Sequence, residues 1–266
     1  MYVVCMNILK SFLNDQRGEI SLEKPMDIRE FLKIVVFALV FAGIIRSFLF
    51  EPFHIPSGSM KRTLLVGDYL FVSKYSYGYS RYSFPFGMIP FSGRIFQSNQ
   101  PERGDIIVFR TPSDTRTDFI KRLIGLPGDR IQVKDGVLYI NGVAVKREKA
   151  GEYIDNEGGD GEKILQIFRE TLPNGVSYDT LDETKNGRLD NTGEYLVPKG
   201  HYFMMGDNRD NSQDSRVLDM VGYVPAENFI GKARIIFFSA DPDIFRIWKI
   251  WAWPKALRNG RFFIVP

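Results

Sequence analysis

The sequence of 266 residues is poor in the residue types that build disulfides and metal centres. Its single cysteine, Cys5, excludes an intrachain disulfide and a cysteine-based zinc site. Two histidines, His54 and His201, leave little material for a histidine-bound metal. The net charge is only +3, which argues against a nucleic-acid binder that relies on many phosphate contacts. We therefore expect no metal, no other cofactor and no nucleic-acid partner.

Long apolar runs are also scarce, which excludes a polytopic transporter. The one strong candidate has an uninterrupted apolar core, Ile34–Ile45, that alone would suit a buried helix or the apolar region of a signal peptide. Lys33 and Arg46 can snorkel, which extends the apolar body to residues 31–50, and a helix of that length spans about 30 Å. No small-residue cleavage site follows. We interpret residues 31–50 as an uncleaved transmembrane anchor; the alternative is a core helix of a soluble protein.

Basic residues on the N-terminal side of this segment favour a cytoplasmic N-terminus. Residues 1–30 are then a cytoplasmic tail, and everything after residue 50 lies outside the cytoplasm.

The helical period disappears after residue 50, where short apolar runs alternate with turn signals. Asp135-Gly136 and Asn141-Gly142 are strong hairpin signals between alternating segments. Strands are expected at Tyr69–Ser73, Asp105–Arg110, Phe119–Ile124, Glu194–Val197, His201–Met205 and Gly231–Phe238. The sequence therefore predicts a mainly β fold: a transmembrane helix followed by an antiparallel sandwich or barrel-like core.

Charge divides the exported part of the chain. Residues 51–129 and 201–266 have net charges of +3 and +2, whereas residues 130–200 have 10 basic and 13 acidic residues. We interpret residues 130–200 as an inserted, smaller β-subdomain, and the two flanking segments, 51–129 and 201–266, as one β core. The alternative is a single sheet with long acidic loops.

A candidate nucleophile lies shortly after the anchor, in the stretch Pro56–Met60 (Pro-Ser-Gly-Ser-Met). A serine beside glycine on a tight turn can expose its hydroxyl, and its own N–H can point at a developing oxyanion. This pattern alone is common in loops, and a serine nucleophile also needs a base. His54 is too close to Ser59 in an extended segment, and His201 begins a strand, so both are more simply surface or half-buried histidines.

A lysine is the other candidate base, provided that burial lowers its pKa. Strand alternation places Phe119, Lys121 and Leu123 on one face, so Lys121 has bulky apolar neighbours that penalise its charged form. Lys61 is nearer Ser59 in sequence but lies in a polar stretch that offers no desolvation. The alternative is that Lys121 extends to solvent, as most strand lysines do.

The stretch Gly206–Arg216 is dense in turn-forming and charged residues. Its spacing does not match an EF-hand calcium loop. Asp–Arg pairs within a loop more simply hold that loop in a fixed shape, and a serine there could orient a neutral lysine amine.

Together these stretches resemble the sequence boxes of bacterial type I signal peptidases (leader peptidases). The matching segments are Pro56–Met60 with Thr63-Leu64 and Gly67-Asp68, Gly104–Phe109, Phe119–Asp129 and Gly206–Arg216. Four boxes in the family's order, with an anchor in the expected place, form a highly specific set.

The resemblance implies a Ser–Lys serine endopeptidase of the bacterial inner membrane, with its catalytic domain on the outer side. Ser59 is then the nucleophile and Lys121 the general base, while Ser57 joins the Ser59 amide in the oxyanion hole. Ser212 would orient the lysine amine, and Asp214 with Arg216 would brace its loop.

The resemblance also implies that the enzyme cleaves signal peptides from preproteins after small P1 and P3 residues, without a metal. The matching pocket residues are Phe53, Ile55, Met60, Leu64 and Ile120. Arg62 stands where the family usually has proline, so this loop is expected to be less rigid. Only one anchor is present where some relatives have two.

Two aromatic stretches suit the headgroup zone of a bilayer: residues 69–96, with ten Tyr or Phe, and residues 244–266, with three Trp, five basic residues and no acids. The alternatives are an aromatic core and a solvated tail. Preproteins, the lipid bilayer and the secretion machinery are thus the expected partners. Two rival functions are a self-cleaving Ser–Lys repressor-type protease and a membrane-anchored β-domain that binds a partner without activity.

Overall fold

The computed structural model describes residues 27–84, 91–97, 99–155, 162–184 and 186–266. The chain divides into a unit of residues 1–43 and a unit of residues 44–266. Most of the predicted cytoplasmic tail, with Cys5, lies outside the described residues.

The apolar segment forms helix α2, Ile28–Phe48, and none of its residues is buried. Asp27 begins it, since its carboxylate accepts a hydrogen bond from the Arg29 amide at 3.2 Å. The helix thus starts three residues before the predicted start at residue 31 and ends two residues before the predicted end at residue 50. Phe50 leaves the helix because it pairs with Ser73 in the first strand pair. In the described part of the chain this is the one helix long and apolar enough to cross a membrane.

The fold is mainly antiparallel β, as predicted. Seven strands form one sheet in the order β1-β2-β14-β3-β4-β12-β13. Their bounds are β1 Phe50–His54, β2 Asp68–Ser73, β3 Ile106–Arg110, β4 Asp118–Gly125, β12 His201–Met205, β13 Val224–Pro225 and β14 Phe229–Ser239. The register of β14 shifts once against β3 and twice against β2. Such bulges bend a strand and increase its twist, which explains how one sheet curls over on itself.

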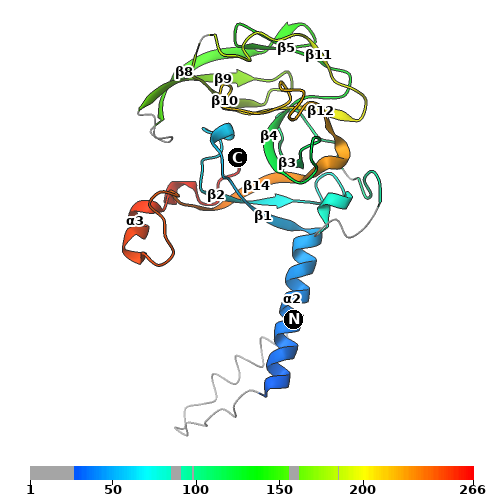
Figure 1. The fold of residues 1–266 in the computed structure, drawn as a ribbon, viewed down its shortest axis with the longest axis vertical. Helices are drawn as coiled ribbons and strands as arrows, with labels where there is room; N and C mark the ends of the chain where they lie inside the picture. The colour runs from blue at the N-terminus through cyan, green and yellow to red at the C-terminus, as the bar shows by residue number, and fades with distance from the viewer. Residues whose placement is uncertain (1–26, 85–90, 98, 156–161, 185) are drawn as a thin grey trace. The chain divides into compact units, whose positions relative to one another are not determined.

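Two further sheets contain the strands from residues 130–200. One has the order β10-β9-β8 and the other β11-β5-β6-β7. The bounds are β5 Arg130–Lys134, β6 Val137–Ile140, β7 Val143–Ala144, β8 Lys146–Asp155, β9 Lys163–Thr171, β10 Ser177–Asp182 and β11 Tyr195–Leu196. Figure 1 shows these strands on one side of the 44–266 unit and β1, β2 and β14 on the other, with β3 and β4 between them. The boundaries of an inserted subdomain remain a prediction.

The two predicted hairpins are present. Asp135-Gly136 joins β5 to β6 and Asn141-Gly142 joins β6 to β7, and all four residues have φ between 47° and 79°. Such left-handed pairs are typical of the two-residue turn that matches the strand twist.

Short helical turns and the C-terminal segment complete the chain. The turns are η1 Gly58–Met60, η2 Arg81–Ser83, η4 Ala226–Asn228, η5 Ile250–Ala252, α3 Trp253–Ala256 and η6 Asn259–Arg261. The C-terminal segment returns to β14 through isolated antiparallel bridges at Ala240–Leu257 and Ile236–Ile264.

Candidate active site

The nucleophile candidate lies in η1, between β1 and β2. Ser57 precedes this turn with an extended backbone, and Ser59 is buried within it. The Ser57 and Ser59 hydroxyl oxygens are 3.5 Å apart. A short helical turn immediately after a strand presents the Ser59 side chain toward the neighbouring strands.

Lys121 lies on β4, and its Nζ is 2.7 Å from the Ser59 hydroxyl oxygen. The amine also donates to the Ile120 carbonyl oxygen at 3.0 Å, and it lies 5.0 Å from the Phe119 ring centre. Lys121 is only 4% exposed, which contradicts the alternative that it extends to solvent. Burial lowers the pKa of Lys121 to about 8, although the Asp214 and Asp207 carboxylates partly offset that effect.

The loop Gly206–Arg216 packs against both residues of this pair. Asp214 accepts hydrogen bonds from Arg216 Nε and Nη2, both at 2.9 Å, and from the Gly206 amide at 3.0 Å. Burial alone would raise the pKa of the Asp214 carboxyl, but the Arg216 guanidinium, together with the Gly206 amide and the Ser212 hydroxyl, holds this pKa below its ordinary value. The predicted Asp–Arg brace is therefore present as a fully buried bidentate ion pair.

Ser212 lies in the same loop and lines the same cleft as Lys121. Its hydroxyl is buried and makes no hydrogen bond of full geometry, although it is near enough to Asp214 to help lower the pKa of that carboxyl. Gly206 brings the loop close: a Cβ there would come within 2.2 Å of the Ser212 hydroxyl and 2.6 Å of the Ser59 carbonyl oxygen. Only glycine allows this approach.

A cleft of about 700 Å³ opens on these residues. Its walls come from residues 53–57 on one side and residues 117–121 on the other. Of the predicted pocket residues, Phe53, Ile55 and Ile120 line it, and Val108 adds to the apolar wall. Met60 and Leu64 are fully buried in the core beneath and are not among the lining residues.

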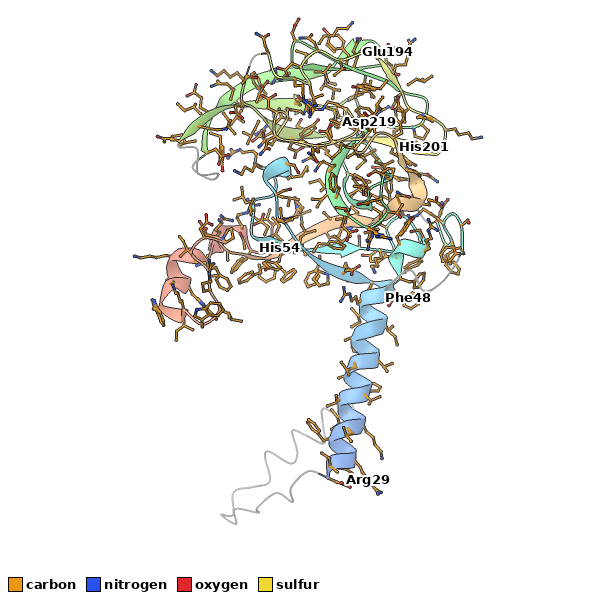
Figure 2. All side chains as sticks on the ribbon, in the orientation of Figure 1. Arg29, Phe48, His54, Glu194, His201 and Asp219 are labelled. Atoms are coloured by element: carbon orange, nitrogen blue, oxygen red, sulfur yellow. The ribbon has the colours of Figure 1, made fainter. Side chains whose placement is uncertain are left out.

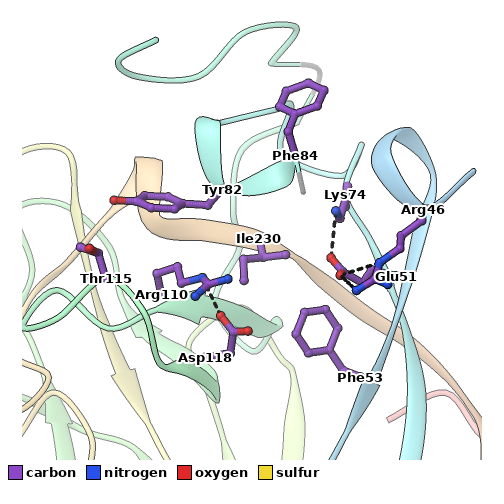
Figure 3. A pocket seen from close by; sticks show the side chains of 10 residues that line it. All are labelled: Arg46, Glu51, Phe53, Lys74, Tyr82, Phe84, Arg110, Thr115, Asp118 and Ile230. Atoms are coloured by element: carbon purple, nitrogen blue, oxygen red, sulfur yellow. Dashed lines mark hydrogen bonds and ion pairs between the residues drawn. The ribbon is translucent and has the colours of Figure 1, made fainter. Parts of the chain in front are cut away.

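A second cavity of about 490 Å³ shares Phe53 and Asp118 with the cleft. Figure 3 shows that its polar side chains are paired: Glu51 lies between Lys74 and Arg46, and Asp118 lies beside Arg110. The polar cavity and the apolar cleft thus meet at Phe53 on β1 and Asp118 on β4.

Neither histidine is paired with Ser59. His54 is exposed and its ring lies 4.8 Å from the Tyr69 ring centre, while His201 Nδ1 is 3.1 Å from the Lys199 carbonyl oxygen (Figure 2). The expectation that both lie at or near the surface fits this placement, although His54 also borders the cleft.

The expectation for Lys61 was wrong. Lys61 is 3% exposed, because its amine is 2.7 Å from both carboxylate oxygens of Asp155 at the end of β8. A contact over 94 residues cannot be read from the local polar stretch. Lys61 is therefore desolvated, but it faces a carboxylate rather than Ser59.

Arg62 takes a backbone conformation that proline cannot adopt. Its φ is +83°, and Lys61 before it has φ −50° and ψ 150°. The Thr63 amide donates to the Met60 carbonyl oxygen at 3.1 Å, which closes a turn of type II. Arg62 Nε also donates to Asp179 at 3.3 Å. The loop is thus held by a different turn from one containing proline, rather than simply loosened.

Two contacts at the site escaped prediction from sequence. The Asn208 amide donates to the Ser59 carbonyl oxygen at 3.1 Å, and its side-chain amide donates to the Gly58 carbonyl oxygen at 3.2 Å. Arg122, which follows Lys121, binds both oxygens of Asp207 at 2.8 and 2.7 Å. Arg122, Asp207 and Asn208 all lie inside the segments that resemble the family's boxes, and this was the sequence signal that could have pointed to them.

Among the described residues, Asp182, Asp190 and Asp210 form a group whose carboxylate oxygens lie within 4.8 Å of one another. Such spacing could hold a cation, but Asp182 already binds Arg147 at 2.5 Å.

Comparison with known proteins gives a consistent result. Residues 28–238 match the family model described as signal peptidase, peptidase S26. The signal peptidase I of Rickettsia typhi is 49% identical in an alignment of length 243 that covers 85% of this chain and 89% of the relative. That of Rickettsia canadensis is 47% identical in an alignment of length 247 that covers 87% of this chain and 91% of the relative. A crystal structure of a signal peptidase I from Enterococcus faecalis is 32% identical, covers 50% of this chain and 97% of that one, and has a TM-score of 0.30.

Proposed function

The chain belongs to the signal peptidase family, peptidase S26, and from this premise we propose how it cleaves signal peptides: Ser59 attacks the peptide bond and Lys121 takes its proton. Family membership makes it a serine peptidase and confirms the resemblance of its four boxes. The observation that carries the assignment of residues is the 2.7 Å contact between the Ser59 hydroxyl and the buried Lys121 amine.

In the proposed reaction, neutral Lys121 accepts the Ser59 proton as the serine oxygen bonds to the carbonyl carbon of the P1 residue. The lysine then gives that proton to the leaving amine, and the peptide C–N bond breaks to leave an acyl-enzyme. Lys121 next takes a proton from water, whose oxygen bonds to the ester carbon. The ester C–O bond then breaks and the lysine returns the proton to the Ser59 oxygen, which leaves the product carboxyl group and neutral Lys121.

Burial is the physical reason for choosing lysine. A solvated lysine is almost fully charged at neutral pH and cannot accept a proton, whereas a pKa of about 8 leaves about a tenth of Lys121 neutral at pH 7. The described hydrogen-bond partners of Lys121 Nζ are the Ser59 hydroxyl and the Ile120 carbonyl oxygen, which are uncharged, whereas Lys61 contacts the Asp155 carboxylate. This pairing supports Lys121 as base over Lys61.

The remaining residues take supporting roles in the proposal. Ser57, with its hydroxyl 3.5 Å from that of Ser59, is placed to donate to the oxyanion together with the Ser59 amide. Ser212 lines the same cleft as Lys121, and its hydroxyl, which makes no hydrogen bond of full geometry in the structure, is proposed to orient the lysine amine. The Asp214–Arg216 pair fixes the loop that carries Ser212.

The substrate is proposed to lie extended in the cleft between residues 53–57 and 117–121. The apolar wall of Phe53, Ile55, Val108 and Ile120 suits small P1 and P3 side chains, because alternate residues of an extended chain point the same way. Met60 and Leu64 support this wall from beneath.

We propose that α2 anchors the enzyme in a bacterial inner membrane, with residues 1–30 cytoplasmic and the catalytic residues outside. Exposed apolar residues in the C-terminal segment support a second contact with lipid. Trp248 and Trp251 are 69% and 74% exposed, and Lys249 lies between them. Aromatic and basic side chains together suit the headgroup zone. The secretion machinery, which delivers preproteins to this surface, is the further proposed partner.

The test uses the full chain in vesicles and a preprotein with an Ala-x-Ala cleavage site. We expect a mature product whose N-terminus follows the second alanine, and no product when that P1 alanine is replaced by leucine. An intact preprotein, or equal cleavage of both substrates, would contradict the proposed function. Protease added outside right-side-out vesicles should digest residues after 50; their protection would contradict the orientation.

A further inference from the structure

The strands of residues 130–200 bear on the geometry of the candidate active site. We propose that Glu170, on β9, is a positioning residue for the reaction, because it holds the loop that aligns Ser59 and Lys121. The inference rests on the proposed function, since it concerns the geometry of that same pair.

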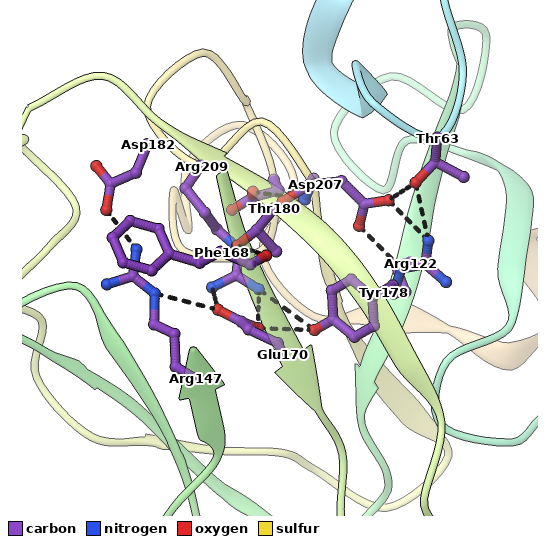
Figure 4. Close-up of polar contacts among 12 residues, drawn as sticks. Thr63, Arg122, Arg147, Phe168, Glu170, Tyr178, Thr180, Asp182, Asp207 and Arg209 are labelled. Carbon is purple, nitrogen blue, oxygen red and sulfur yellow. Dashed lines mark hydrogen bonds and ion pairs between the residues drawn. The ribbon is translucent and has the colours of Figure 1, made fainter. Parts of the chain in front are cut away.

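Glu170 is fully buried and is bound by three groups. Arg209 Nη1 and Nη2 donate to its two carboxylate oxygens at 2.8 and 2.5 Å, and the Tyr178 hydroxyl donates to the second at 2.9 Å. Arg147 Nε lies 3.8 Å from the first oxygen. Figure 4 shows these side chains converging from β8, β9 and β10 on an arginine of the Gly206–Arg216 loop. A fully buried carboxylate between two guanidinium groups is held in one position.

The contact passes directly to the catalytic loop. Arg209 Nε donates to the Gly206 carbonyl oxygen at 3.3 Å, and Arg216 Nη2 donates to the Arg209 carbonyl oxygen at 2.7 Å. Arg209 is 3% exposed and thus cannot take another position without losing its partner. Glu170 therefore restrains both ends of the loop segment that contains Ser212 and Asp214.

A backbone connection follows the same route. The Leu181 amide donates to the Asp207 carbonyl oxygen, and the Arg209 amide donates to the Leu181 carbonyl oxygen, both at 2.8 Å. This parallel bridge encloses Asn208, whose amide donates to the Ser59 carbonyl oxygen at 3.1 Å. Asn208 thus connects β10 directly to Ser59.

Glu170 does not line the cleft, so it cannot act by binding substrate. Its loss should leave KM nearly unchanged and lower kcat, because a small displacement of Ser59 relative to Lys121 slows proton transfer by about 10- to 100-fold. A loosened loop also admits water to Lys121. Since burial is the largest cause of the lowered pKa of Lys121, the midpoint of the pH–rate profile should then rise above about 8. A weaker effect of the Asp214 and Asp207 carboxylates, which raise this pKa, would offset only part of that rise.

The experiment compares the full-length wild type with Glu170→Gln on an Ala-x-Ala peptide, with kcat corrected for the folded fraction. Tyr178→Phe removes one hydrogen bond to Glu170 and keeps the ring; it decides the matter if Glu170→Gln does not fold. Val133→Ala, a buried change in β5 away from the loop, is the control for lost stability. Glu148→Gln, an exposed change on β8, is the control for charge.

The proposal is supported if Glu170→Gln or Tyr178→Phe lowers the corrected kcat, leaves KM within about twofold and raises the midpoint, while both controls keep the wild-type midpoint. It is overturned if the folded variants keep the wild-type kcat and midpoint, or if Val133→Ala moves the midpoint equally. Wild type without peptidase activity would instead overturn the proposed function, and the inference with it.

Discussion

Replacing Lys121 by methionine should remove activity and yet stabilise the protein. The amine is 4% exposed and its pKa falls from 10.5 to about 8. One pKa unit corresponds to about 1.4 kcal/mol, so burying this lysine costs about 3 kcal/mol of folding free energy at pH 7. Methionine has a similar length and no charge to desolvate. It leaves the Ile120 carbonyl oxygen without its donor, a loss of about 1 kcal/mol. The net gain is about 2 kcal/mol.

The pH dependence of stability tests independently whether burial of the charged Lys121 destabilises the fold. Between pH 8 and 10.5 the unfolded lysine is still protonated while the folded one is not, so the unfolded state binds more protons. The free energy of unfolding of the wild type should therefore rise with pH across this window. Lys121→Met should lack this rise, because it has no group that titrates there.

Urea unfolding of both proteins from pH 7 to 10.5 measures the effect, with Lys134→Met at the exposed end of β5 as control. Activity of the wild type should fall about tenfold per pH unit below 8. A variant less stable than the wild type at pH 7, or a wild-type activity midpoint near 10.5, would refute the idea that burial prepares Lys121 as a base.

Four further substitutions test the surroundings of the site. Gly206→Ala should lower kcat by about 100-fold, because its Cβ would lie 2.2 Å from the Ser212 hydroxyl and 2.6 Å from the Ser59 carbonyl oxygen; unchanged peptide cleavage would contradict this. Leu64→Ala should destabilise the fold by about 2 to 5 kcal/mol in urea titrations, since Leu64 is fully buried. Arg62→Pro should cost about 3 kcal/mol, because φ is +83°, whereas Arg62→Gly should stay within about 1 kcal/mol of the wild type. Equal stability of these two variants would show that the turn is not left-handed.

The fold class followed from the sequence because its signals are local. Asp135-Gly136 and Asn141-Gly142 specify their hairpins by backbone conformation alone. The strands β8 and β9 were not predicted, since charged residues such as Lys146 and Lys163 begin them and their stability comes from pairing with each other. A strand whose partner supplies its stability carries little signal of its own.

The contact between Ser59 and Lys121 could be predicted because the boxes mark both residues, but their surroundings could not. Lys61 was placed in a polar stretch without desolvation, whereas Asp155 buries it from a distant strand. Met60 and Leu64 were assigned to the pocket, whereas both are buried in the core beside it. The sequence around Glu170 did not indicate its proposed role, because that role depends on a contact with Arg209, 39 residues away. Contacts between distant segments determine these positions.

The most direct test of the account is the cleavage of one Ala-x-Ala preprotein by four forms of the full chain at pH 9. The account predicts cleavage by the wild type, loss of at least about 1000-fold in Ser59→Ala and in Lys121→Met, and full activity in the exposed control Ser92→Ala. Far-UV circular dichroism would verify that all four are folded. Full activity in either Ser59→Ala or Lys121→Met would contradict the Ser–Lys mechanism.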